Sequence, residues 1–311
     1  MKGAYFYGVE ATAPWTVEAP VATELAPRVM PDSEHLIPYH VLVRGRCHAT
    51  LVSGRSVVDS VAMESGDVVV FPHGDSHVMS SAPGLRPPAG DQMKSAPPPF
   101  PVLVQLRGDG DEQAQFVCGF LGCHLRPFNP LLATLPRMIH MRGTPDGALA
   151  RFSAQAAEEA VARRSGGALV LTRLSELMFI EVVRRHVDSL PDDRSGWLAG
   201  LRDPSVGRAL ALLHAEPARA WTLPELANEA AVSRSVLAER FASFVGQPPM
   251  QYLAQWRMQL AANLLAETNT KVSDVALRVG YDSEAAFSRA FKKSVGVPPA
   301  EWRRKRSPVP V

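Results

Sequence analysis

Two copies of one helical pattern occupy the C-terminal part of this 311-residue chain. The second copy, residues 271–303, reads KVSDVALRVGYDSEAAFSRAFKKSVGVPPAEWR. Its apolar residues recur at spacings of three and four on both sides of a short turn that contains Gly280, and Ser283 is placed to cap the helix that follows. This spacing predicts two short amphipathic helices joined by a tight turn, which is the geometry of a helix-turn-helix unit.

The first copy, residues 222–253, reads TLPELANEAAVSRSVLAERFASFVGQPPMQYL and repeats the pattern, with Ser233 as the cap and Ala231 in place of the turn glycine. Between the copies, residues 250–267 predict one long helix. A helix of about 17 residues spans about 25 Å, which suits two units held near the ~34 Å pitch of B-DNA. The repeat therefore predicts that one chain engages two successive major grooves.

The outward side chains of the second helix in each copy are the candidates for DNA contact. Arginine and serine suit base edges and phosphates, and lysines near a helix end suit phosphates. From Asp203 onward, 14 Lys and Arg face 10 Asp and Glu, a balance that also favours a polyanion. The alternative is a pair of helical hairpins with solvated polar faces. The candidates are Arg234, Ser235, Arg240, Glu284, Ser288, Arg289, Lys292 and Lys293.

The run from Pro204 to Arg303 resembles the DNA-binding domain of the AraC family of bacterial transcription regulators. The resemblance implies a seven-helix domain that positions RNA polymerase at a promoter. It also implies a homodimer formed through the region that precedes this domain. The residues that carry it are Val275, Ala276, Val279, Gly280, Tyr281, Ser283, Phe287, Ser288, Arg289, Phe291, Lys292, Gly296 and Pro299.

Residues 31–140 have a different sequence pattern. Short segments in which apolar and polar residues alternate are separated by a glycine about every ten residues, which predicts an all-β sandwich or barrel. Residues 66–77, GDVVVFPHGDSH, fit the pattern G-x5-P-x-G-x2-H of the second cupin motif. The segment resembles a cupin jelly roll, in particular the form that precedes AraC-type domains.

Four residues of this segment are candidate metal ligands, namely His40, Cys47, His77 and Cys118. Strand alternation places His40 and Cys47 on one face, the resemblance to the cupin motif implies that His77 points inward, and the strand of Cys118 returns to the same barrel wall. Two imidazoles with one or two thiolates form a soft tetrahedral set that suits zinc. The alternative is a set of buried core residues. Three cysteines, an odd number, argue against a disulfide framework, and a thiolate beside histidines would be oxidisable, which makes Cys118 a candidate redox sensor.

Residues 127–190 turn helical, with predicted helices at 149–163 and 168–187. The second is apolar around most of its circumference, so it is either clamped against the barrel or paired with its twin in a dimer. The proline-rich residues 83–101 predict a long loop, and residues 191–196 predict a linker.

The predicted fold class is a multi-domain α+β protein. It consists of a cupin-like β-barrel (jelly roll) sensor domain at 1–140, a helical connector or dimerisation region at 141–195, and a C-terminal all-α domain with two helix-turn-helix units at 196–311. No apolar run approaches the ~20 residues that span a bilayer, and the first residues lack the features of a signal peptide. These observations predict a cytoplasmic protein without a membrane partner.

The predicted function is a sequence-specific DNA-binding transcription regulator and not an enzyme. Its cupin domain would sense an unknown small molecule, a metal or an oxidant, and its partners would be promoter DNA, RNA polymerase and a second copy of the chain. The alternative is a metal-dependent cupin enzyme, a dioxygenase or isomerase, fused to a DNA-binding tail. Against it, the first cupin motif is missing its paired histidines, and Pro38 stands where its glutamate would fall. A third reading makes the barrel a dimerisation module without a ligand.

Overall fold

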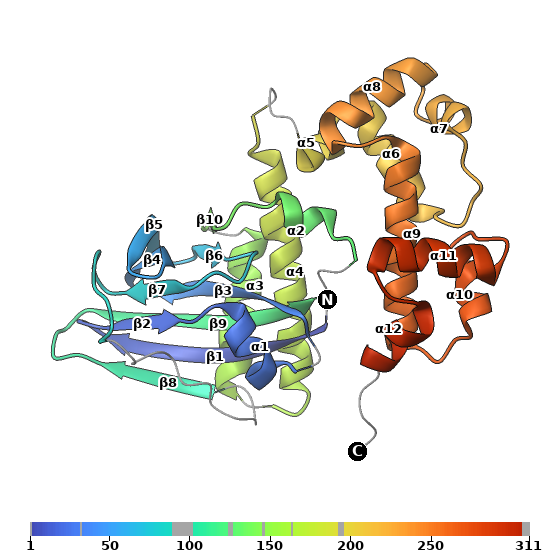
Figure 1. Ribbon diagram of the computed structural model, residues 1–311. Helices are drawn as coiled ribbons and strands as arrows, with labels where there is room; N and C mark the ends of the chain where they lie inside the picture. Colours follow the sequence, from blue (N-terminus) through green and yellow to red (C-terminus); the bar gives the residue numbers. More distant parts are fainter. Residues whose placement is uncertain are drawn as a thin grey trace. The chain divides into compact units, whose positions relative to one another are not determined.

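The computed structural model describes residues 2–31, 33–88, 102–123, 127–144, 147–162, 164–191 and 196–306. The chain forms two compact units. The first comprises Met1–His124 and Leu135–Ser189, and the second comprises Leu125–Thr134 and Leu190–Val311. The first unit is built on β-sheets and the second is helical (Figure 1), as the sequence predicts. Most of the predicted loop, residues 89–101, and of the predicted linker, residues 192–195, lies outside the described residues.

The larger sheet of the first unit has six strands in the order β10-β6-β3-β9-β1-β8. Neighbouring strands run antiparallel, except that β8 runs parallel to β1. In the pairing of β3 with β9, His40 lies directly opposite Cys118. The bounds are β1 Lys2–Thr12, β3 His35–Arg44, β6 Val68–Val70, β8 Val102–Arg107, β9 Gln113–Cys123 and β10 Ile139–Met141.

The smaller sheet has the order β2-β7-β4-β5, with β2 Thr16–Ala19, β4 Arg46–Ser53, β5 Ser56–Glu64 and β7 His77–Ser80. Successive side chains of a strand point to opposite faces, and one face of each sheet contributes to a common core that helix α1 (Ala22–Val29) joins. Large rings fill much of this core. They include Tyr7, Trp15, Phe71, Phe116 and Phe120, all 5% exposed or less.

Helices α3 (Ala148–Ala162) and α4 (Gly167–Asp188) pack on β1, β3 and β9 of the six-stranded sheet (Figure 1). The Tyr39 hydroxyl on β3 lies 2.6 Å from the Ser175 hydroxyl on α4. Residues predicted as a separate connector therefore belong to the first unit. The physical reason is that β3 and β9 are buried on both faces, which requires an apolar cover on the side away from the core.

The second unit contains α2 (Pro130–Thr134) and the helices from α5 onward. Helix α9 runs between two helix pairs, α7–α8 with α6 at one end and α10–α11 with α12 at the other (Figure 1). The predicted long helix at 250–267 is α9, and Ser233 and Ser283 cap α8 and α11 as predicted. The bounds are α5 Trp197–Arg202, α6 Pro204–Ala215, α7 Leu223–Glu229, α8 Arg234–Val245, α9 Pro249–Glu267, α10 Val272–Arg278, α11 Glu284–Val295 and α12 Pro299–Arg306.

The turns of the two helix pairs differ in the residue that takes the left-handed conformation. Gly280 does so with φ 83° in the second pair, and Ala231 does so with φ 56° in the first. A Cβ on Gly280 would also come within 2.6 Å of the Ala218 carbonyl oxygen. The guanidinium of Arg257, on α9, donates to the carbonyls of Pro217 and Arg219 at 2.7 and 2.9 Å. The loop before α7 is thus held close against the turn of the second pair.

These geometries predict opposite effects of a matched pair of substitutions on the free energy of unfolding. Gly280→Ala should lower it by about 2 kcal/mol or more, because a left-handed alanine costs roughly 1–2 kcal/mol and its methyl group meets a carbonyl. Ala231→Gly should raise it by up to about 1 kcal/mol, because relief of the same strain exceeds the extra entropy of an unfolded glycine.

Urea unfolding followed by tryptophan fluorescence measures both changes. Four of the five tryptophans, Trp197, Trp221, Trp256 and Trp302, lie in the second unit, so the signal reports mainly on it. A stabilising Gly280→Ala or a destabilising Ala231→Gly would contradict the strain argument.

Candidate functional site

The first turn of α8 presents the predicted contact residues of the first helix pair. Arg234 and Ser235 are exposed, while Leu237 and Phe241 on the opposite side of the helix are completely buried. The Ser235 hydroxyl lies 3.2 Å from that of the capping Ser233. Within the described part of the chain Arg234 makes no ion pair, so its guanidinium is available to a ligand in front of the helix.

Arg240 has a structural partner that sequence reasoning missed. Its guanidinium forms an ion pair with Asp203, a residue 37 positions earlier whose side chain is 4% exposed. Asp203 also caps α6, since its Oδ1 accepts from the backbone N–H groups of Ser205 and Val206 at 3.0 and 2.9 Å. Burial alone would raise the pKa of Asp203, yet these hydrogen bonds and Arg240 bring it below its ordinary value.

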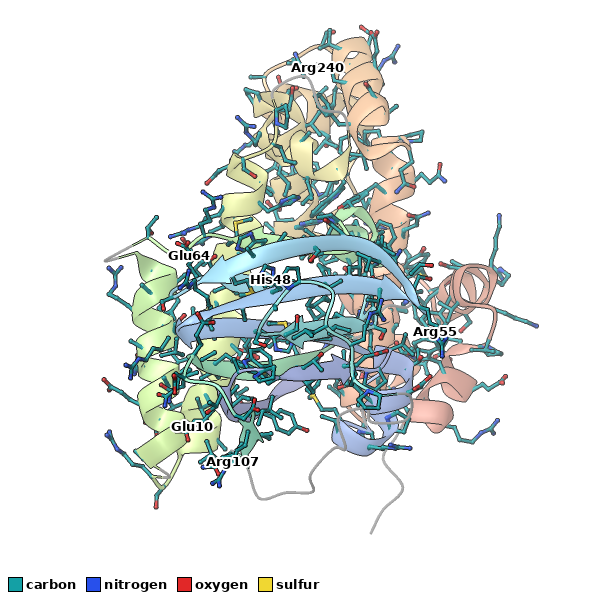
Figure 2. All side chains as sticks on the ribbon, turned by 90° about the vertical axis from the view of Figure 1, so that its left-hand side faces the viewer. Glu10, His48, Arg55, Glu64, Arg107 and Arg240 are labelled. Carbon is teal, nitrogen blue, oxygen red and sulfur yellow. The ribbon has the colours of Figure 1, made fainter. Side chains whose placement is uncertain are left out.

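The ion pair gives Arg240 a structural role. It ties α8 to α6 and indicates that this side chain positions the helix, whereas a base contact would require it to release Asp203. Its DNA contact is untested and stays a prediction. Figure 2 shows where Arg240 lies on the helical unit.

Helix α11 presents the candidates of the second pair. Glu284, Arg289, Lys292 and Lys293 are exposed and Ser288 is half-buried, while the opposite face of the helix contributes two completely buried phenylalanines to the core. No ion pair engages Arg289, Lys292 or Lys293 within the described ranges. The lysines lie in the last turn, where positive charge also complements the helix dipole. Four of these five side chains are exposed as predicted, and their contact with DNA stays a prediction.

A buried chain of hydrogen bonds joins three of the four predicted metal ligands in the first unit. His40 Nδ1 lies 2.7 Å from Cys118 Sγ, and His40 Nε2 lies 2.8 Å from His77 Nε2. The Phe71 ring stacks on His77 with its centroid 3.9 Å away. We call these three residues, His40, His77 and Cys118, the buried cluster. Cys47 on β4 is buried in the same core but is not part of this chain of bonds.

The backbone decides which way the hydrogen bonds of the buried cluster point. His77 Nδ1 lies 2.9 Å from the carbonyl oxygen of Asp75, and because a carbonyl only accepts, Nδ1 carries the proton. His77 Nε2 in its neutral form is then an acceptor, so His40 donates through Nε2 and accepts at Nδ1 from the Cys118 thiol. The order of donation is Cys118 to His40 to His77 to Asp75.

The surroundings hold all three groups neutral. Burial lowers the pKa of His77 to about 4, and burial together with the neighbouring His77 lowers the pKa of His40 well below its ordinary value. Burial also raises the pKa of the Cys118 thiol well above its ordinary value. A protonated, buried thiol is a poor nucleophile, so this geometry does not favour the redox-sensor hypothesis for Cys118, which stays a prediction.

The geometry of the buried cluster does not fit a bound zinc ion. Zinc needs donors that converge on one point at about 2.0–2.3 Å, whereas His40 turns its two nitrogens toward different partners. Within the described ranges, no three His, Cys, Asp or Glu side chains are grouped to hold a metal. Zinc binding by His40, Cys47, His77 and Cys118 stays a prediction.

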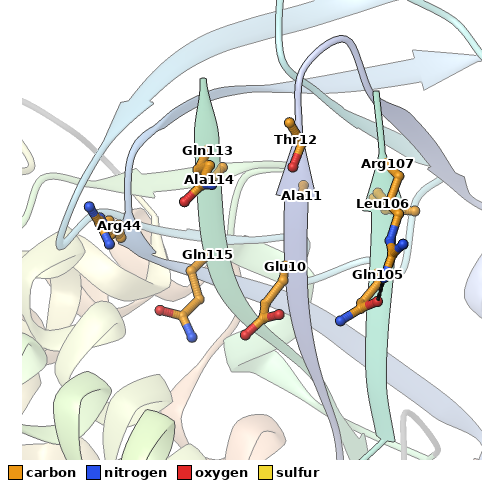
Figure 3. A pocket seen from close by; sticks show the side chains of 10 residues that line it. All are labelled: Glu10, Ala11, Thr12, Arg44, Gln105, Leu106, Arg107, Gln113, Ala114 and Gln115. Atoms are coloured by element: carbon orange, nitrogen blue, oxygen red, sulfur yellow. Dashed lines mark hydrogen bonds between the residues drawn. The ribbon is translucent and has the colours of Figure 1, made fainter. Parts of the chain in front are cut away.

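A surface hollow of about 290 Å³ lies at one end of the six-stranded sheet, over β1, β8 and β9 (Figure 3). Its polar lining includes Glu10, Arg44 and Arg107, all exposed, and Arg107 donates to Gln105 at 2.7 Å. Figure 2 shows Glu10 and Arg107 together at this end. No residue of the buried cluster lines the hollow, so it is a separate feature of the unit.

Comparisons with known proteins agree with both units. A family model described as Cupin matches residues 1–188, and one described as Helix-turn-helix domain matches residues 226–305. The chain is 34% identical to an AraC-like transcription regulator of Streptomyces lividans, over 88% of each chain. It is 31% identical to the HTH-type transcriptional regulator AlkR of Acinetobacter baylyi, over 86% of this chain and 87% of that protein.

Among solved structures, the DNA-binding domain of AdpA in complex with a target DNA is 30% identical to this chain. The match covers 33% of this chain and 92% of that one, with a TM-score of 0.31. The family model and these two relatives show that the chain belongs to the AraC-like transcription regulators with an N-terminal cupin domain. Both relatives are named as regulators, which supports a regulatory rather than an enzymatic reading. In the part of the chain that the structure describes, no helix has the length and apolar character needed to cross a membrane.

Metal analysis of the purified protein tests the zinc prediction. Zinc at the cluster predicts a stoichiometric metal content that His77→Ala abolishes and His48→Ala preserves, because alternation along β4 turns His48 away from the core. A protein without zinc, or one whose zinc survives His77→Ala, would reject the site.

Proposed function

We propose that this regulator binds promoter DNA with α8 and α11 in two successive major grooves. The observation that carries the proposal is the set of exposed cationic side chains on these two helices, Arg234, Arg289, Lys292 and Lys293, which make no ion pair within the described residues while the opposite helix faces are packed in cores. Helix α9 has 19 residues, a length of roughly 28 Å, which suits the separation of adjacent grooves.

In this proposal the cupin domain senses an effector and changes DNA binding by the second unit. A small molecule, a metal or an oxidant that disturbed the buried cluster would leave at least one buried polar group without its partner, at a cost of about 1–3 kcal/mol. That cost is comparable with the coupling free energies of typical allosteric proteins. Once on the promoter, the DNA-binding unit would position RNA polymerase, the partner that the family resemblance implies.

Arg234 and Lys292 should affect DNA binding in different ways. Arg234→Ala is expected to relax the preference at one base step by about 1–3 kcal/mol, because an arginine bound to guanine through two hydrogen bonds reads that base. Lys292→Ala is expected to weaken all sequences alike and to reduce the salt dependence of binding by about one charge.

Binding to a randomised duplex pool, followed by affinity measurements at two or more salt concentrations, distinguishes the two effects. Thr172→Ala, on α4 of the first unit, is a control that should leave the selected sequence and the affinity unchanged. If Arg234→Ala instead lowered the affinity for all sequences equally, Arg234 would contact only phosphate and the predicted base contact would be wrong.

We also propose that the protein is a homodimer whose subunits meet along the outer face of α4. Val170, Leu177 and Ile180 on this helix are 37%, 45% and 43% exposed, although the same helix buries other apolar residues against the sheet. With Arg173 and Arg184 they follow the spacing of three and four that lets one helix pack along another. A second copy of α4 offers the same stripe and would bury it, as a two-fold interface requires.

A charge in the middle of this stripe should break the dimer. Ile180→Glu is expected to raise the dimer dissociation constant by tenfold or more, since burial of a charged carboxylate in an apolar interface costs several kcal/mol. Sedimentation velocity over a concentration series measures the change. Val57→Glu, on the exposed strand β5, is the matched control and should leave the mass unchanged. A dimer that survives Ile180→Glu would move the interface elsewhere.

A further inference from the structure

We propose that residues 127–140 form a strap through which the cupin domain acts on the DNA-binding unit. This inference rests on the proposed function, because it names the segment that would carry the signal. The chain leaves the six-stranded sheet at the end of β9, contributes residues 127–134 to the second unit, and returns to the same sheet as β10. Ordering this excursion costs conformational entropy at each residue, so its contacts on the second unit must offset that cost.

The first half of the strap is docked by specific contacts. The backbone N–H of Phe128 donates to Gln259 Oε1 at 2.8 Å, and the amide nitrogen of Gln259 donates to Asn263 at 3.1 Å. Gln259 is 7% exposed, so without Phe128 its oxygen would be a buried acceptor lacking this partner. Leu132 is 4% exposed, and α2 packs against α5.

The docking point lies against the core of the first helix pair. The Phe128 ring meets Tyr252 edge to face at 5.4 Å, and Tyr252 meets Phe241 of α8 in the same way at 5.8 Å. The Tyr252 hydroxyl accepts from Trp197 Nε1 at 3.2 Å and lies 2.7 Å from His214 Nε2. Tyr252 is completely buried on α9, the helix between the two pairs. A shift of Phe128 would therefore be felt by both α8 and α9.

The second half of the strap is bound to the cupin domain by a hydrogen bond and an ion pair. The Leu135 carbonyl accepts from His73 at 2.8 Å, and Arg137 binds both carboxylate oxygens of Asp75, at 2.6 and 3.2 Å. Asp75 is also the residue whose carbonyl ends the buried chain of hydrogen bonds. One residue thus contacts the buried cluster through its backbone and the strap through its side chain. Such a continuous series of contacts can transmit a change between sites when the strap has two arrangements.

A double-mutant cycle on the full-length protein tests the coupling. The probe is a duplex that the protein itself selects from a random pool, and the cluster is perturbed by His77→Gln or by Cys118→Ala. Each is expected to change the DNA dissociation constant by about fivefold or more. With Arg137→Gln present, the same perturbation should change it by less than about twofold, because the side-chain grip on Asp75 is lost.

Arg46→Gln is the matched control. It removes an arginine from an exposed ion pair with Glu112 in the same unit, leaves the Asp75–Arg137 pair in place, and should preserve the full effect of the cluster variants. The strap proposal would be overturned if the cluster variants changed the dissociation constant equally with and without Arg137→Gln. It would also be overturned if neither cluster variant changed the dissociation constant. Failure of every form to bind DNA would instead reject the proposed function.

Hydrogen exchange on the full chain gives a second readout that does not depend on DNA. Gln259→Met removes the acceptor of the Phe128 N–H, and Arg137→Gln removes the grip at the other end. Both should accelerate exchange of amides in residues 127–134 by tenfold or more relative to Arg46→Gln. Unchanged exchange in both variants would show that these contacts do not hold the segment and would also overturn the proposal.

Discussion

One carbonyl oxygen, that of Asp75, sets the direction of a whole chain of hydrogen bonds inside the cupin domain. Because it accepts the proton of His77 Nδ1, every later donor and acceptor as far as Cys118 is determined. Two imidazoles and a thiol could not otherwise remain in a core lined by Phe71 and Phe116, since each unpaired polar group would cost about 1–3 kcal/mol. The cluster is thus tolerated only as a complete set, and that makes it sensitive to any change at one member.

The DNA-binding unit depends on a different constraint, the close approach of backbone segments. Ala276 and Phe287 are completely buried where α10 meets α11, and Gly280 leaves room for the Ala218 carbonyl. Interiors are packed at crystal-like density. The distance between the second helix pair and the loop before α7 is therefore set by Gly280, which has no side chain, and by Arg257, which binds that loop. A stiff spacing between recognition helices is what two successive grooves would demand.

The two units share the strap, and this has a consequence for how a signal would travel. Residues 127–134 belong to the second unit, where Phe128 donates to Gln259 and Leu132 is buried, while β9 before them and β10 after them in the chain belong to the first unit. The cupin domain would then be coupled to the DNA-binding unit through this covalent segment, which the ion pair of Arg137 with Asp75 holds at its cupin end.

Periodicity was enough to predict the elements that repeat. Residues at spacings of three and four predicted α8, α9 and α11, with caps at Ser233 and Ser283, and strand alternation predicted that His40 and Cys47 face one interior, because both patterns are local consequences of backbone geometry. Only the tertiary structure decided that Arg240 pairs with Asp203, that the helices after β10 cover the sheet, and that residues 127–134 join the second unit. These features depend on partners 37 to 136 positions away, and a sequence pattern does not show which distant surface a side chain contacts.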